Sequence, residues 1–154
     1  MRTIKDYSDF TIIAEYKRRF ESVSEAPVKS SKASYQALLQ AIADDKDAEK
    51  DREHFYVMFL NGQNKVIKIE RMFTGTITSS AVYPREVIKA ILKHEAAAII
   101  LMHNHPSGEI TPSSSDRAVT TKLKAACESI DVDILDHIII GKTEYYSFSD
   151  HNLL

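Results

Sequence analysis

The chain has 154 residues, of which 44% are hydrophobic and 27% charged, as expected of a globular domain with its own core. The net charge of −2 gives no support to a nucleic-acid partner beyond a local basic patch. The single cysteine, Cys127, excludes an internal disulfide framework and a cysteine-based zinc cluster, and its apolar helical position predicts a core residue. No apolar run is long enough to span a membrane, and the N-terminus lacks a signal-peptide core, which predicts a cytoplasmic location.

Residues 1–45 are predicted to form an N-terminal extension that packs on a domain formed by residues 46–154. Within the extension, the apolar patch in residues 8–20 predicts a short strand. A helix follows, with Ser34 as its predicted N-cap. Its core-facing residues are predicted to be Leu38, Leu39 and Ile42.

The spacing of apolar residues changes from residue 54 onwards. Residues 54–60 are apolar at both odd- and even-numbered positions, which predicts a strand covered on both faces. Asn61-Gly62 predicts a hairpin with a type I′ turn, because such a turn needs positive φ at both central positions. Residues 65–73 return as a strand, and residues 75–83 predict another strand or an extended crossover.

Helices and strands then alternate. Pro84 fits the first turn of a helix, a strand is expected at 96–102, and Ser113 begins another helix. The first of these helices is predicted to bury a stripe of Val87, Ile88, Ile91 and Leu92. Two further strands are expected at 132–140 and 144–149. This order predicts an α/β protein in which a mixed sheet lies between helices as a three-layer α-β-α sandwich.

The apolar run Ala96–Met102 stops at His103-Asn104-His105, and a loop with Gly108 and two prolines leads to Asp116. Two histidines at i and i+2 leaving a strand project to the same side. A carboxylate eleven residues later can return to the same ion if the loop turns. Three N/O ligands with one position left for water are typical of catalytic zinc, whereas structural zinc favours four closed ligands. The spacing therefore predicts one zinc ion held by His103, His105 and Asp116.

Each part of this pattern also has a structural explanation. Ser113-x-x-Asp116 is close to a capping box, and an aspartate in the first helical turn is favourable without any metal. A single histidine beside a buried strand is usually a core residue. Capping does not explain two histidines at the end of an apolar strand, however, and Ser113 can cap the helix while Asp116 binds a metal.

The pattern His103-x-His105, seven residues, Ser113, two residues, Asp116 resembles the JAMM (MPN+) metalloprotease motif. The chain resembles the RadC family over about residues 50–150. The segments that carry this resemblance are HNHPSG…PSSSD, LDHIIIG at 135–141 and YYSF at 145–148. This resemblance implies a cytidine-deaminase-like (JAB/MPN) fold and one zinc ion on the three residues predicted above.

The resemblance further implies a glutamate, upstream of the histidines, that acts as general base. Glu53 occupies the matching position, at the end of the charged run 44–53 that is otherwise read as a solvated linker. Ser113 would stabilise the oxyanion of a tetrahedral intermediate. The competing glutamates are Glu70, Glu86, Glu95 and Glu109.

The leading hypothesis is a zinc-dependent hydrolase that cleaves a peptide or isopeptide bond in a peptide or protein substrate. The alternative is a DNA-repair-associated or interaction module with a zinc site and little or no catalysis. A zinc deaminase is disfavoured, because those enzymes use H-x-E with P-C-x-x-C. Asn104 stands where deubiquitinating members carry Ser or Thr, so ubiquitin-chain specificity is not implied. Asp136-His137 is predicted to be a structural pair, or less simply a carboxylate–imidazole support for the metal site.

Overall fold

The computed structural model describes residues 26–47, 51–78 and 80–154. The strand predicted within residues 8–20 lies outside these ranges. In the part of the chain that is described, no helix is both long and apolar enough to cross a membrane.

The centre of the protein is one five-stranded sheet with the order β2-β1-β3-β4-β5. Its strands are β1 (His54–Leu60), β2 (Val66–Thr74), β3 (Ala98–Asn104), β4 (Asp133–Ile140) and β5 (Tyr145–Ser147). The central pair, β3 and β4, is parallel, and the other neighbours are antiparallel. The sheet is therefore mixed, as predicted.

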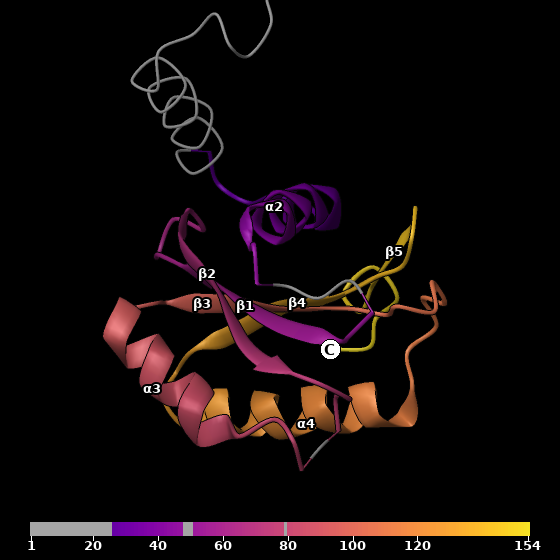
Figure 1. Cartoon of the computed structure of the whole chain (residues 1–154). Coiled ribbons are helices and arrows are strands. Elements are labelled where there is room, and N and C mark those ends of the chain that lie inside the picture. The colour runs from indigo at the N-terminus through magenta and orange to yellow at the C-terminus, as the bar shows by residue number, and fades with distance from the viewer. Residues whose placement is uncertain (1–25, 48–50, 79) are drawn as a thin grey trace, which may run out of the picture.

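Three described helices cover the sheet. Helix α2 (Ser31–Asp44) lies on one face, and α3 (Pro84–His94) and α4 (Ser114–Glu128) lie on the other (Figure 1). Helix α4 connects the parallel strands β3 and β4, because such strands need a crossover between them. This arrangement confirms the α/β class and the α-β-α layers.

The two cores follow the alternation of side chains along the strands. Every residue of β1 is buried, which confirms the prediction of a strand covered on both faces. Its odd-numbered residues, such as Phe55, pack with α3 and α4, whereas the even-numbered ones, such as Tyr56, pack towards α2. Strand β3 follows the same rule: Ile99 and Leu101 lie in the core on the side of α3 and α4. His103, two residues further, therefore points towards α4.

The hairpin between β1 and β2 differs from the predicted type I′ turn. Positive φ occurs at Asn64 (58°) and not at Asn61 or Gly62. The Asn61 N–H donates to the Lys65 carbonyl at 3.0 Å, and the Asn64 N–H donates to the Asn61 carbonyl at 2.9 Å. The loop is thus three residues long and ends in a left-handed asparagine, a turn that the Asn-Gly pair alone did not distinguish.

Several helix details were also predicted incorrectly. Ser30 caps α2, with its side chain accepting from the Ala33 N–H at 3.2 Å, while Ser34 is buried inside the helix. The predicted buried residues Leu39 and Leu92 are 42% and 65% exposed. Hydrophobicity placed them in the core, but each lies on the edge of its helix away from the sheet.

Two strand predictions change as well. The described residues between 75 and 83 form no strand, so only the crossover alternative survives there. Strand β3 begins and ends two residues later than predicted, since its pairing with β4 continues to Asn104 opposite Ile140. His103 is consequently part of the strand and shares its rigidity.

Candidate metal centre

The site lies where β3 ends and α4 begins. His103 is fully buried in β3, and His105 follows two residues later on the same side. Asp116 is in the first turn of α4 and is 2% exposed. The chain between them turns back so that strand end and helix start face each other.

The three predicted ligands converge on one point. His103 Nε2 lies 3.0 Å from His105 Nε2 and 3.1 Å from Asp116 Oδ1. His105 Nε2 lies 3.4 Å from Asp116 Oδ2. One ligand atom of each residue falls within 4.8 Å of the others, so His103, His105 and Asp116 form a group able to hold a metal ion.

Helix capping and ligand placement coexist at Asp116. The Ser113 hydroxyl oxygen accepts from the Asp116 N–H at 3.1 Å, and the Ser113 N–H donates to Asp116 Oδ2 at 2.7 Å. This reciprocal pair is a complete capping box. It orients the carboxylate of Asp116 towards the histidines, so the two explanations of this motif do not exclude each other.

The loop after β3 fixes the ring of His105. Its Nδ1–H donates to the Glu109 carbonyl at 2.6 Å, which leaves Nε2 facing Asp116. Its backbone N–H donates to the Ile140 carbonyl at 2.8 Å. Because a carbonyl can only accept, the tautomer of His105 is defined directly by its neighbour.

The electrostatics of the group reflect its crowding. Burial by itself would raise the pKa of Asp116, but the adjacent rings of His103 and His105 hold it well below its usual range. The Asp116 hydrogen bond in turn raises the pKa of His105, against the lowering effect of burial. Both shifts favour a negatively charged Asp116 carboxylate beside a positively charged His105 ring.

A second, fully buried layer lies behind His103. His103 Nδ1 contacts His137 Nε2 at 2.8 Å, and His137 Nδ1 contacts Thr120 Oγ1 at 2.7 Å. Burial, first of all, and then the charge of His103 place the pKa of His137 well below its ordinary value. Thr120 was not singled out as a site residue from the sequence; its position one helical turn after Asp116 is the signal that could have identified it.

Asp136 and His137 do not form a joint carboxylate–imidazole support for the metal site, which was the less favoured of the two roles expected for them. Neighbouring residues of a strand point to opposite faces. The Asp136 carboxylate instead accepts from the Ser147 hydroxyl at 2.6 Å and from the Ser149 N–H at 3.0 Å. Asp136 therefore anchors the turn after β5, and the imidazole partner near the site is Thr120.

Glu53 immediately precedes β1 and lies on the same face as Phe55. Its carboxylate Oε2 accepts from the Ile77 N–H at 2.6 Å, and its carbonyl accepts from the Gly75 N–H at 2.9 Å. Its charge makes the smallest of the contributions that raise the pKa of His105, behind those of Asp116 and Glu109.

Asn104 holds the backbone on both sides of Glu53. Its Oδ1 accepts from the His54 N–H at 2.8 Å, and its Nδ2 donates to the Arg52 carbonyl at 2.9 Å. The ladder between β1 and β3 ends at Phe55 opposite His103, and the Asn104 side chain extends it by one step.

Of the competing glutamates, Glu70, Glu86 and Glu95 have partners away from the ligand group, whereas Glu109 lies in the loop that holds His105. Glu70 contacts His94 and Lys93, and Glu86 contacts Arg85 and Lys89. Glu95 is the left-handed C-cap of α3. The Glu109 carboxylate accepts from the N–H and hydroxyl of Thr111 at 3.0 and 2.7 Å.

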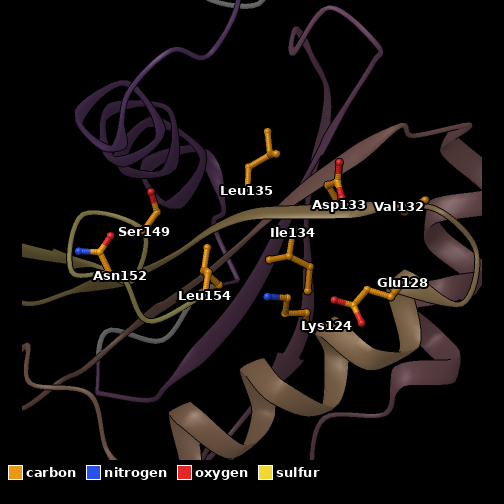
Figure 2. Close-up of a pocket in the computed structure, with 9 residues that line it drawn as sticks. All are labelled: Lys124, Glu128, Val132, Asp133, Ile134, Leu135, Ser149, Asn152 and Leu154. Atoms are coloured by element: carbon orange, nitrogen blue, oxygen red, sulfur yellow. The ribbon is translucent and has the colours of Figure 1, made fainter.

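A separate cavity of about 450 Å³ lies beside the end of α4 and the start of β4 (Figure 2). Lys124, Ile134 and Leu154 are among the residues that line it. It shares no residue with the His103, His105 and Asp116 group.

Comparison with known proteins agrees with this geometry. The family described as RadC-like JAB domain matches residues 28–153. A UPF0758 protein of Actinobacillus pleuropneumoniae serotype 5b is 56% identical over 101 residues, which are 66% of this chain and 46% of that protein. The UPF0758 protein YeeS of Escherichia coli K12 is 51% identical over 104 residues, 68% of this chain and 70% of that protein.

The longest of these similarities is to a UPF0758 protein of Vibrio atlanticus, 42% identical over 146 residues, which cover 94% of this chain and 63% of that protein. The chain spans about half the length of the Actinobacillus relative that it matches. With the family match over most of its length, the chain belongs to the RadC-like JAB domain family.

Proposed function

We propose that this protein is a zinc-dependent metallohydrolase of the JAMM type that cleaves a peptide or isopeptide bond. The observation that carries the proposal is the convergence of His103, His105 and Asp116, with a half-buried glutamate beside them. Ligand atoms at about 2.0–2.1 Å from a tetrahedral zinc ion lie roughly 3.3 Å apart. The distances of 3.0, 3.1 and 3.4 Å between the three residues fit this geometry.

The donor set also fits zinc chemically. Two neutral imidazoles and one carboxylate leave a coordination position for water, as in catalytic rather than structural sites. A zinc ion held there would polarise both a water molecule and the carbonyl of the substrate.

Glu53 is assigned the role of general base. Its Oε2 accepts a hydrogen bond from the Ile77 N–H. The other carboxylate oxygen, Oε1, would therefore accept and release the proton. This oxygen would take a proton from the attacking water and later deliver it to the leaving amine.

Ser113 is assigned the role of oxyanion donor. In the capping box its oxygen only accepts, from the Asp116 N–H, so its own hydroxyl proton is available to a substrate. Ser113 is exposed at the start of α4, where the helix dipole also favours negative charge.

The test compares Glu53→Gln with Glu86→Gln, a control on the exposed face of α3. Cleavage of a mixed peptide library would be followed by mass spectrometry of new N-termini. Glu53→Gln should retain zinc and lose turnover by roughly 100-fold or more, because general-base catalysis is worth 10²–10⁴-fold. Glu86→Gln should resemble the wild type.

Full activity of Glu53→Gln would contradict the assignment of the base. A wild-type protein that binds zinc, cleaves nothing and binds DNA in a salt-sensitive manner would instead support the interaction-module alternative.

A further inference from the structure

We infer that Thr120 and His137 are positioning residues that determine which ring nitrogen of His103 is free to bind the metal. The inference rests on the proposed metal site, but not on hydrolysis. It follows from a chain of buried hydrogen bonds that runs from the backbone of α4 to the ring of His103.

The two candidate histidine ligands are held in different ways. His105 donates from Nδ1 to a carbonyl, which fixes its tautomer directly. The Nδ1 of His103 instead meets another imidazole, His137, at 2.8 Å. A contact between two imidazoles does not by itself define which nitrogen carries the proton.

The direction is set at the far end of the chain. Thr120 Oγ1 lies 2.7 Å from the Asp116 carbonyl oxygen. Two oxygens this close need a proton between them, and a carbonyl has none, so the Thr120 hydroxyl must donate. A threonine that bonds to the carbonyl four residues earlier is a common arrangement within a helix.

With its proton committed, Thr120 Oγ1 can only accept from His137. His137 Nδ1, 2.7 Å away, must then carry the ring proton. A neutral His137 has its lone pair on Nε2, and the fully buried ring contacts aromatic neighbours such as Phe55 and Phe148. His137 Nε2 therefore accepts from His103 Nδ1–H.

This order leaves the lone pair of His103 on Nε2. That nitrogen is the one that lies 3.0 Å from His105 Nε2 and 3.1 Å from Asp116 Oδ1. The first turn of α4 thus supplies Asp116 as a ligand and, through its backbone carbonyl, orders the protons that prepare His103. Hydrogen bonds of this kind behind a ligand typically change metal affinity by 10–100-fold.

The experiment measures zinc affinity by competition with a chromogenic chelator in four variants of the full chain. Thr120→Val keeps the side-chain volume and removes the hydroxyl, whereas Thr120→Ser restores the hydroxyl. His137→Phe fills the site without an acceptor. Thr121→Val is the matched control, because Thr121 makes the same bond to the carbonyl four residues earlier, at 3.0 Å, on the exposed side of α4.

Thr120→Val and His137→Phe should lose roughly 10–100-fold in zinc affinity. Thr120→Ser and Thr121→Val should remain close to the wild type. Wild-type affinity in Thr120→Val, with an unchanged thermal unfolding transition, would overturn the inference.

A second readout needs no metal and no substrate. Long-range ¹H–¹⁵N spectra of the metal-free protein, at a pH where neutral imidazole dominates, report the proton position on each ring. His103 should carry its proton on Nδ1, and in Thr120→Val both His103 and His137 should move towards the Nε2–H form. A His103 Nδ1 that carries no proton in the wild type would overturn the inference. If the wild type took up no zinc, the proposed function would fail while these spectra still decided the question of proton order.

Discussion

At the scale of single residues, Asn104 connects the strand that carries the histidines to the segment that carries the candidate base. Its two side-chain bonds fasten the Arg52 carbonyl and the His54 N–H, on either side of Glu53. The same residue lies between His103 and His105 in sequence. One asparagine therefore relates the position of the candidate base to that of the ligands.

Replacing Asn104 by alanine should separate metal binding from catalysis. The ligands remain, so zinc content should not change, whereas Glu53 loses its fixed position and turnover should fall roughly 10–100-fold, as expected for a displacement of about 1 Å. Loss of one partly buried and one exposed hydrogen bond should also lower the free energy of unfolding by about 1–2 kcal/mol. Asn104→Asp retains the acceptor for the His54 N–H but cannot donate to the Arg52 carbonyl. Its turnover and its free energy of unfolding should lie between those of the wild type and Asn104→Ala. Wild-type turnover in Asn104→Ala would show that Glu53 needs no such support.

The raised pKa of His105 predicts opposite pH trends for the metal-free and metal-loaded protein. A histidine with a raised folded-state pKa stabilises the fold below its unfolded pKa of about 6.5, and this contribution disappears as pH rises through the folded value. Metal binding requires the deprotonated ring, so zinc stabilises more at higher pH. Thermal unfolding with and without zinc should therefore diverge as pH increases above about 6.5. A constant difference across this range would contradict the assignment of His105 as a ligand.

At the scale of elements, the loop between β3 and α4 is held against the turn between β4 and β5. A Cβ added at Gly141 would lie 2.6 Å from the Gly108 carbonyl oxygen and 2.7 Å from the Ile110 Cγ2. The requirement at Gly141 is space rather than an unusual backbone conformation. The same loop carries His105 and the Glu109 carbonyl that orients it.

Gly141→Ala should accordingly displace the loop and weaken zinc binding. The closest contacts are with backbone and a neighbouring branched side chain, so the loop must move by several tenths of an ångström. We expect a loss of roughly 10-fold or more in zinc affinity, since groups that orient a ligand typically matter by 10–100-fold. Gly62→Ala is the control, because a Cβ at Gly62 meets nothing within 4 Å. Equal zinc affinity in the two variants would show that the loop is not fixed by this contact.

At the scale of the whole molecule, most of the fold was predictable from hydrophobic periodicity. The buried strands β1, β3 and β4 and the helices α3 and α4 were expected close to their observed positions. Details that depend on contacts between elements were not predictable from the sequence. Whether Leu92 faces the core or solvent depends on where α3 meets the sheet, and the turn at Asn61-Gly62 depends on the register of β1 with β2.

In the candidate site, likewise, the ligands were predictable from the sequence and the residues that support them were not. The spacing of His103, His105 and Asp116 reflects local geometry, namely strand alternation followed by a helix start, so their convergence was predictable. The support by Thr120 and Asn104 depends on which elements become neighbours in space. Thr120 meets His137 across α4 and β4, and Asn104 meets Arg52 across β3 and the segment before β1, contacts that no periodicity in the sequence specifies.

The central claim is a single zinc ion shared by the end of β3 and the start of α4. Its most direct test is the zinc content of the purified protein, measured by elemental mass spectrometry together with circular dichroism. The wild type should carry one zinc ion per chain, removable by a chelator, and His103→Ala and Asp116→Ala should each lose it while the helices and strands persist. A folded wild-type protein that remains free of metal when supplied with excess zinc would contradict the account.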